Sequence, residues 1–200
     1  MKTFTQLLVV AALAAPAFAQ TQLVRGDVNG IQGTNLFQLD CTNIQLTSST
    51  LNLQALHDAT RQTNNDYDLQ VVQVGSNPVV LDVVSATLVP ELFQMGNLRF
   101  GRSETWEVFG PAGSPTAVFI ALRSTTGYAP IGAQGTWLLG PSYGRLMFGV
   151  IGPLGRFEFQ FQMPALPALV GTEITSQAII APPGQPAYVT NPDCKEVRAN

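Results

Sequence analysis

The sequence predicts an all-β protein: a small barrel-like region with one short helix, followed by an antiparallel β-sandwich. Three observations lead to this prediction. Short segments repeatedly alternate apolar and polar side chains, as half-buried strands do. Glycine and proline, with 18 and 14 residues, separate these segments at short intervals. Hydrophobic residues make up 46% of the 200-residue chain, which is enough for a packed core and too much for a disordered chain.

The first 19 residues are predicted to be a secretory signal peptide. Lys2 precedes an apolar run over residues 7–15, and Ala17 and Ala19 supply the small-x-small pattern of a cleavage site. The run is too short to span a bilayer as a permanent helix, and no later apolar run is longer. We therefore expect cleavage after Ala19 and a mature chain without a membrane span. Its location would be extracellular, at the cell surface or periplasmic.

Residues 20–92 are predicted to form the barrel-like region. Alternation of side chains predicts strands at 23–28, 36–46, 67–74 and 79–86. Between the second and third of these, Leu53, Leu56 and Ala59 share one face of a helix expected over residues 52–61. Strands followed by a helix and two final strands resemble the order of the OB-type barrel. A generic β-meander is the alternative.

The end of the first strand carries two local motifs. Asp27 and Asn29 are spaced like the first ligands of an EF-hand calcium loop. However, the positions of that loop that need an oxygen ligand, a glycine and a glutamate hold Ile31, Gln32 and Gln38. Such a loop is therefore excluded, and the Asn29-Gly30 pair instead predicts a two-residue hairpin turn.

Residues 93–200 are predicted to form the β-sandwich. Strands are expected at 98–109, 116–123, 135–139, 145–151, 156–163, 173–180 and 187–190. The clearest alternation places Phe157, Phe159, Phe161 and Met163 on one face of a strand, and this face is expected to enter the core. The boundary between the two regions is not marked by a flexible linker.

The C-terminal half also resembles β-sandwich modules of unknown function that occur in exported bacterial proteins. Those modules end in a Pro…Leu-x-Gly-x-x-x-x-x-Gln-Ala pattern, which is matched here by Pro167, Leu169, Gly171, Gln177 and Ala178. The resemblance implies export and a β-sandwich. It implies no catalytic residue and no ligand.

Both cysteines, Cys41 and Cys194, belong to the mature chain. Two cysteines in an exported protein most often pair, so we expect a disulfide that ties the C-terminal tail to the N-terminal region. A pair of buried free thiols is the alternative.

The sequence offers no credible catalytic constellation, and we expect a protein that is not an enzyme. The Gly-Pro-Ser-Tyr-Gly run at 140–144 matches the nucleophile elbow of α/β-hydrolases, but a strand follows it and the only histidine, His57, precedes Ser142. A lone histidine also makes a zinc site improbable, so no metal and no cofactor are predicted. Glycoside hydrolysis needs a pair of carboxylates, and no pair in this sequence is distinguished by its spacing. The candidates are Asp66, Asp68, Glu104, Glu107 and Glu158.

Charged residues make up only 12% of the chain, with a formal net charge of −3. Lys195 is the only lysine after the signal peptide, and no basic stripe is present. Nucleic acid is therefore excluded as a partner, because phosphate binding would lack its electrostatic driving force. A weakly charged surface also gives little repulsion between copies, so a subunit of a larger assembly is a further hypothesis.

Binding is the leading functional hypothesis. Tyr128, Tyr143, Trp106 and Trp137 are candidates for a platform that stacks on sugar rings or other apolar faces. The tryptophans lie in predicted strands, where a core position is the stronger expectation, whereas the tyrosines lie nearer turns. The sequence thus predicts an exported binding or structural protein. A glycan and another surface protein are the two hypotheses for its partner. The alternative is a carbohydrate-binding or carbohydrate-active, glycoside hydrolase-like, secreted protein.

Overall fold

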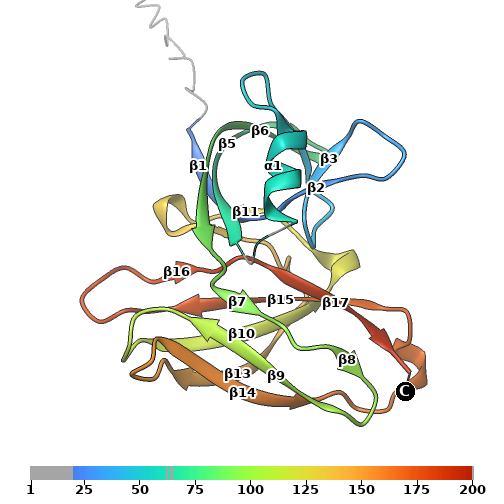
Figure 1. Ribbon diagram of the computed structural model, residues 1–200, viewed down its shortest axis with the longest axis vertical. Coiled ribbons are helices and arrows are strands. Elements are labelled where there is room, and N and C mark those ends of the chain that lie inside the picture. Colours follow the sequence, from blue (N-terminus) through green and yellow to red (C-terminus); the bar gives the residue numbers. More distant parts are fainter. Residues whose placement is uncertain (1–19, 62, 64, 200) are drawn as a thin grey trace, which may run out of the picture.

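The computed structural model describes residues 20–61, 63 and 65–199, so the predicted signal peptide lies outside the described residues. These residues are mostly strands with a single α-helix, which confirms the predicted all-β class. Figure 1 shows a small barrel, formed by the N-terminal half, above a wider sandwich formed by the C-terminal half. No helix in this part of the chain is long and apolar enough to cross a membrane.

The barrel has the strand order of the OB type. Its strands are β1 (Gln22–Gly26), β2 (Val28–Gly30), β3 (Phe37–Leu39), β4 (Gln45–Thr47), β5 (Asn65–Ser76) and β6 (Val79–Pro90). They lie in the order β1-β5-β6-β4-β3-β2, and only the β4–β6 pair is parallel. Only Asp27 separates β1 from β2, so the two ends of this order are adjacent in the chain and the sheet curves into a barrel (Figure 1). The helix α1 (Leu53–Thr60) lies between β4 and β5, where OB-type barrels carry theirs.

The local sequence explains where α1 begins and which face it buries. The Asn52 side chain accepts a hydrogen bond from the Ala55 N–H at 3.2 Å and so caps the N-terminus. Leu53 and Leu56 pack into the barrel core, whereas Ala59, which was expected on the same face, is exposed. The predicted helix is therefore confirmed, but its last turn buries Thr60 in place of Ala59.

The predicted hairpin turn at Asn29 and Gly30 is wrong. Both residues lie in β2, where Gly30 pairs with Phe37 of β3. The turn comes later, and the Ile31 N–H donates to the Leu36 carbonyl at 2.9 Å across it. Pairing with β3 extends β2 through Gly30, so contacts along the strand override the local preference of Asn-Gly for a tight turn.

The sandwich consists of two facing sheets. The larger contains β13 (Tyr143–Val150), β10 (Pro115–Leu122), β15 (Glu173–Ile180), β17 (Asp193–Arg198) and β8 (Leu98–Arg99), with β16 (Tyr188–Val189) also paired to β15. The smaller contains β14 (Arg156–Gln162), β9 (Ser103–Phe109) and β7 (Phe93–Gln94). All pairs are antiparallel except β17 with β8. Short elements complete this half: β11 (Ala129–Pro130), β12 (Thr136–Trp137), and the 3-10 helices η1 (Arg123–Thr125), η2 (Gly132–Gln134) and η3 (Pro167–Leu169).

The sandwich core lies between these two sheets. Phe159 and Met163 are buried in it, and Phe157 and Phe161 pack against it, which confirms the alternation read from β14. Trp106 of β9 is 0% exposed, and its ring centroid lies 5.0 Å from that of Phe161. A second core fills the barrel.

Buried polar contacts join the two halves. The Asn191 side chain accepts hydrogen bonds from the Leu92 and Phe93 N–H groups at 2.9 and 3.0 Å, just where β6 passes into β7. Cys41, directly after β3, and Cys194 of β17 are paired at disulfide distance with Cα atoms 5.3 Å apart, which confirms the predicted pairing. The halves are thus held together by specific bonds as well as by packing.

Candidate functional site

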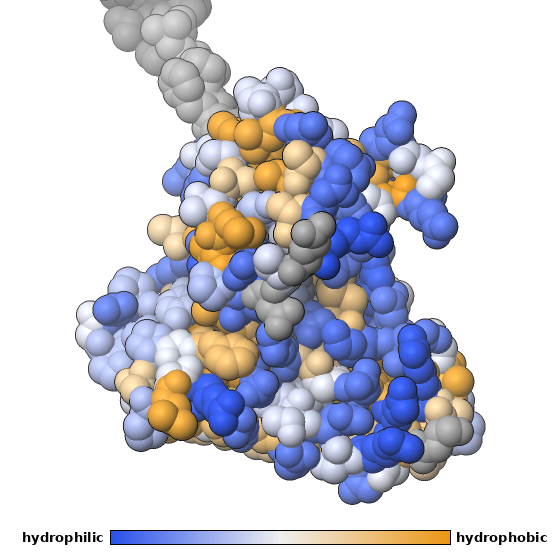
Figure 2. Space-filling model, viewed as in Figure 1, coloured by the Kyte–Doolittle hydropathy of each residue, from blue (hydrophilic) through white to orange (hydrophobic). Residues whose placement is uncertain are grey.

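The junction between barrel and sandwich presents two different surfaces. On the face shown in Figure 2, hydrophobic residues gather on the left of the junction and hydrophilic residues on its right. A groove of about 570 Å³ lies at the junction, and we call it the junction groove. It is lined by Leu23, Arg25, Leu92, Ile131, Ala133, Gln134, Gly135, Pro186, Ala187, Tyr188 and Val189. Both halves of the protein therefore contribute to it.

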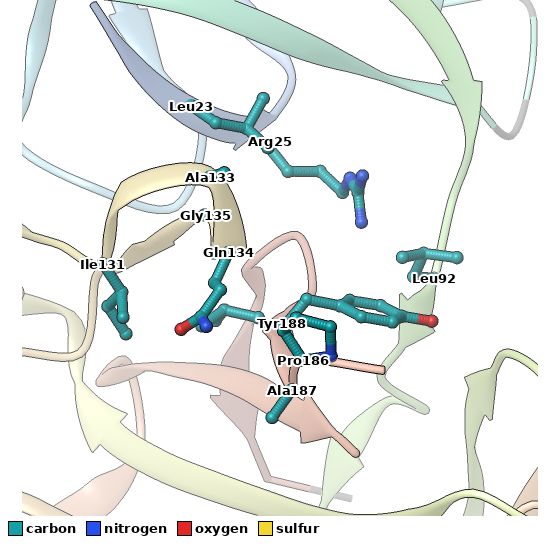
Figure 3. Close-up of a pocket in the computed structure, with 11 residues that line it drawn as sticks. Leu23, Arg25, Leu92, Ile131, Ala133, Gln134, Gly135, Pro186, Ala187 and Tyr188 are labelled. Atoms are coloured by element: carbon teal, nitrogen blue, oxygen red, sulfur yellow. The ribbon is translucent and has the colours of Figure 1, made fainter. Parts of the chain in front are cut away.

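The polar groups of the junction groove come from three elements. Arg25 of β1 is fixed by Asp68, which accepts from its Nε at 2.6 Å and from its Nη2 at 2.8 Å. Figure 3 shows the Arg25 guanidinium above the ring of Tyr188, with Gln134 between Tyr188 and Ile131 in this view. Burial raises the pKa of Tyr188, so its hydroxyl stays protonated and able to donate at neutral pH. The groove thus offers hydrogen bonds beside an apolar wall.

A second, apolar cleft of about 340 Å³ adjoins the junction groove, and Ile131 lines both. We call it the aromatic cleft. Its rings belong to Phe119, Trp137 and Tyr143, with centroids 5.0 to 5.7 Å apart and each pair packed edge to face. Tyr143 is 50% exposed, so part of this cluster is open to solvent. Edge-to-face packing holds each ring at a fixed angle to its neighbours.

The strand pattern explains why these rings meet outside the sandwich core. Val118 and Ile120 of β10 face the core, so Phe119 between them points to the opposite side of the sheet. Trp137 is carried by β12, which pairs with β11 and covers that side. The buried Gln177 of β15 holds this hairpin, accepting from the Leu138 N–H at 3.0 Å and donating to the Thr136 carbonyl at 3.0 Å.

The structure brings together two of the four aromatic residues proposed from the sequence. Trp137 and Tyr143 both line the aromatic cleft. Tyr128 packs against the barrel core instead, its hydroxyl donates to the Gln22 side-chain oxygen, and burial raises its pKa to about 12. Trp106 lies in the sandwich core and offers no surface to a ligand. Phe119 was missed because it lies in an unbroken apolar run, residues 118–122, where the predicted strand at 116–123 shows no alternation that would mark an outward face.

None of the residues weighed for catalysis lies in the groove or the cleft. The His57 Nδ1–H donates to the Val28 carbonyl at 3.0 Å and attaches α1 to β2. Ser142 is exposed in the turn before β13. Glu107 and Glu158 face each other across β9 and β14, and Arg156 lies 3.5 and 3.2 Å from them. Desolvation and then Glu158 raise the pKa of Glu107, as expected for neighbouring like charges.

The barrel carries a further cleft on the face that binds ligands in OB-type proteins. In that fold the second and third strands form the binding face. Here β1 and β2 together take the place of the first strand, so β3 and β4 are the corresponding pair. They contribute to a shallow cleft of about 340 Å³. Leu36 at its rim is exposed, and none of its lining residues is basic. The cleft thus lacks the positive charge that attracts a phosphate backbone.

Comparison of the chain with protein families, with curated proteins and with solved structures found no match.

Proposed function

We propose that the protein is an exported, non-enzymatic binding protein whose ligand occupies the aromatic cleft and the adjoining junction groove. The observation that carries this proposal is the half-open cluster of Phe119, Trp137 and Tyr143 on the outer face of the larger sheet. Aromatic rings at a solvent-open cleft supply a flat apolar surface, and the groove beside them supplies hydrogen-bond donors.

Carbohydrate is the ligand class that this combination fits best. The apolar face of a sugar ring stacks on an aromatic side chain, while its hydroxyl groups need donors and acceptors such as the Gln134 amide and the Tyr188 hydroxyl. Binding is favoured over hydrolysis because no carboxylate is among the residues that line the cleft or the groove, and glycoside hydrolysis needs two.

Saccharide binding is expected to change the fluorescence of Trp137 and to depend on Tyr143. We expect a glycan array to identify a ligand, and Tyr143→Ala to weaken its binding about tenfold or more, since a buried aromatic contact is often worth over 1.4 kcal/mol. Trp106 is buried elsewhere and gives a constant background signal. Calorimetry and fluorescence titration of both proteins measure the difference.

Tyr128→Phe is the matched control, because it alters a tyrosine outside the cleft and should bind as the wild type does. Equal affinity in Tyr143→Ala and the wild type would reject the proposed site. Turnover in a hydrolase substrate panel that one Asp or Glu substitution abolishes would reject the non-enzymatic part.

Export is supported by the signal-peptide pattern before Gln20 and by the pairing of Cys41 with Cys194. Protein recovered from the medium or periplasm of an expressing cell is expected to begin at Gln20. Intact mass and N-terminal sequencing check this, and secreted material that retains Met1 would contradict it.

A further inference from the structure

A second cavity at the junction, distinct from the junction groove, is strongly acidic. It has a volume of about 240 Å³, and we call it the acidic cavity. Five carboxylates line it, from Asp27, Asp40, Asp66, Glu91 and Asp193. Among the described residues that line it, Lys195 is the only basic one. A cavity with this excess of negative charge favours a cationic occupant.

The fold gathers these carboxylates because four of them lie at or next to strand ends of the barrel, on the side where the fifth lies in β17. Asp27 occupies the break between β1 and β2, and Asp66 is the second residue of β5. Asp193 opens β17 in the sandwich. The cavity therefore lies between the two halves, close to the paired Cys41 and Cys194.

Three of the five carboxylates have partners. Asp193 accepts from the Met95 N–H at 2.7 Å and pairs with Lys195 at 3.1 Å. Glu91 accepts from the Gln94 amide at 2.8 Å, and Asp40 accepts from the Asn29 amide at 3.2 Å. These bonds hold the wall of the cavity in place.

Asp66 and Asp27 differ from those three. Asp66 is only 5% exposed, and its Oδ2 is buried without a hydrogen-bond partner among the described residues. Oδ1 of Asp27, a half-buried residue, also has no hydrogen-bond partner among them. Native structures rarely leave a buried carboxylate oxygen unpaired, because desolvation of the charge is expensive.

We propose that the acidic cavity binds a calcium ion, with Asp66 and Asp27 as its central ligands. Oxygen donors select a hard cation, and the sulfur atoms nearby are joined in the disulfide. In the described part of the chain, no three carboxylates hold their oxygens within 4.8 Å of one another. The ion therefore retains water in its coordination shell. Calcium tolerates this, because its coordination is larger and less regular than that of magnesium.

Such an ion would stabilise the junction. It would bind Asp27 and Asp66 of the barrel directly and interact through its bound water with Asp193 of the sandwich. A partly hydrated site of this kind is expected to have a Kd on the order of 10⁻⁴–10⁻³ M, the range of extracellular calcium modules. This inference is independent of the ligand proposed for the aromatic cleft.

Calcium titration of the chelator-treated mature protein tests the proposal. In about 5 mM CaCl₂, a concentration above the expected Kd range, the wild type should melt roughly 3–6 °C higher than in EDTA. Calorimetry should give one site. Asp66→Asn keeps the shape of the side chain and removes the charge, so it should abolish both the melting shift and the binding heat.

Asp58→Asn is the matched control, because Asp58 is exposed on α1 and its loss changes the net charge equally. This variant should bind calcium as the wild type does, and Asp27→Asn should weaken binding at least about tenfold, a loss of about 1.4 kcal/mol. Asp27→Asn also serves as the test if Asp66→Asn fails to fold. A wild type that responds to CaCl₂ no more than to NaCl of equal ionic strength overturns the proposal, as does full binding in both cavity variants.

Discussion

Replacing Cys41 and Cys194 together with alanine is expected to lower the free energy of unfolding by about 5 kcal/mol. The two residues are 153 positions apart in the sequence. A bridge across a loop of that length removes conformational entropy from the unfolded chain, and the loop-entropy relation gives about 5 kcal/mol at 25 °C. Since small proteins have only about 5–15 kcal/mol of stability in total, this would be a large fraction of it. The melting temperature should fall by roughly 10–20 °C.

The effect should be concentrated at the junction, because the bridge joins the barrel at the end of β3 to β17 of the sandwich. Urea denaturation of the double variant measures it, and the wild type in reductant should give the same midpoint. Hydrogen exchange at Leu92 and Phe93, whose N–H groups are bonded to Asn191, should speed up more than exchange within β14. A double variant with wild-type stability would show that the junction is held by packing and buried hydrogen bonds alone.

The fold class and several elements follow directly from local periodicity. The strand expected at 173–180 is β15 with the same bounds, and the alternation at 156–163 assigned the core face of β14 correctly. These segments succeed because a two-residue period fixes which side chains face the core, whatever the partner strands are. The order of strands around α1 matches that of the OB-type barrel, which was one of the two arrangements expected from the sequence.

Elements that depend on distant partners could not be predicted in the same way. The strand β17 carries the polar run Asp193-Cys-Lys-Glu196, which has no apolar face, and it forms because β15 and β8 flank it. The strand expected at 98–109 is divided between two sheets, since Gly101, with φ 66°, turns the chain between β8 and β9. Both outcomes are decided by tertiary pairing.

The candidate sites were also predictable only in part, because residue type can be read from the sequence and the meeting of distant residues cannot. Tyr143 and Trp137 were proposed from residue type and proximity to turns, but their meeting with Phe119 requires the pairing of β10 with β13 and the position of β12. The acidic cavity left no sign in the sequence. Asp27, Asp66 and Asp193 are far apart in the chain, and only closure of the barrel against the sandwich brings them to one cavity.

In metal-free buffer, the protein is expected to lose stability as the pH rises from about 4 to about 8. The pKa of Asp66 is raised by burial from its ordinary value of 3.8 to about 8, and that of Asp27 by burial and then by Asp40 to about 6. Between those values the folded protein holds protons that the unfolded chain has released. Because the folded state then binds more protons, its stability falls as the pH increases.

The size of this effect is set mainly by Asp66, the most buried carboxylate of the cavity. Ionising a carboxyl group whose pKa is raised this far costs roughly 6 kcal/mol, at 1.36 kcal/mol for each pH unit. Asp27, Glu91 and Asp193 face Asp66 and add to the cost, whereas the positive charge of Arg25 offsets part of it. The stabilisation that the protonated carboxyl group of Asp66 provides is therefore complete below about pH 4 and lost above about pH 8.

Urea denaturation in EDTA across this pH range measures the dependence, and Asp66→Asn should remove most of it. The amide carries no charge at any pH, so the variant should be more stable than the wild type at pH 8 and about equal to it at pH 4. Asp58→Asn, on the exposed face of α1, should follow the wild-type curve. A wild-type stability that stays constant or rises over this range would show that solvent or a nearby cation already neutralises Asp66. Where the expected pH dependence is observed, calcium should be added at pH 8. If it restores the stability of the wild type and leaves that of Asp66→Asn unchanged, the same carboxylate accounts for both the pH dependence and the cation site.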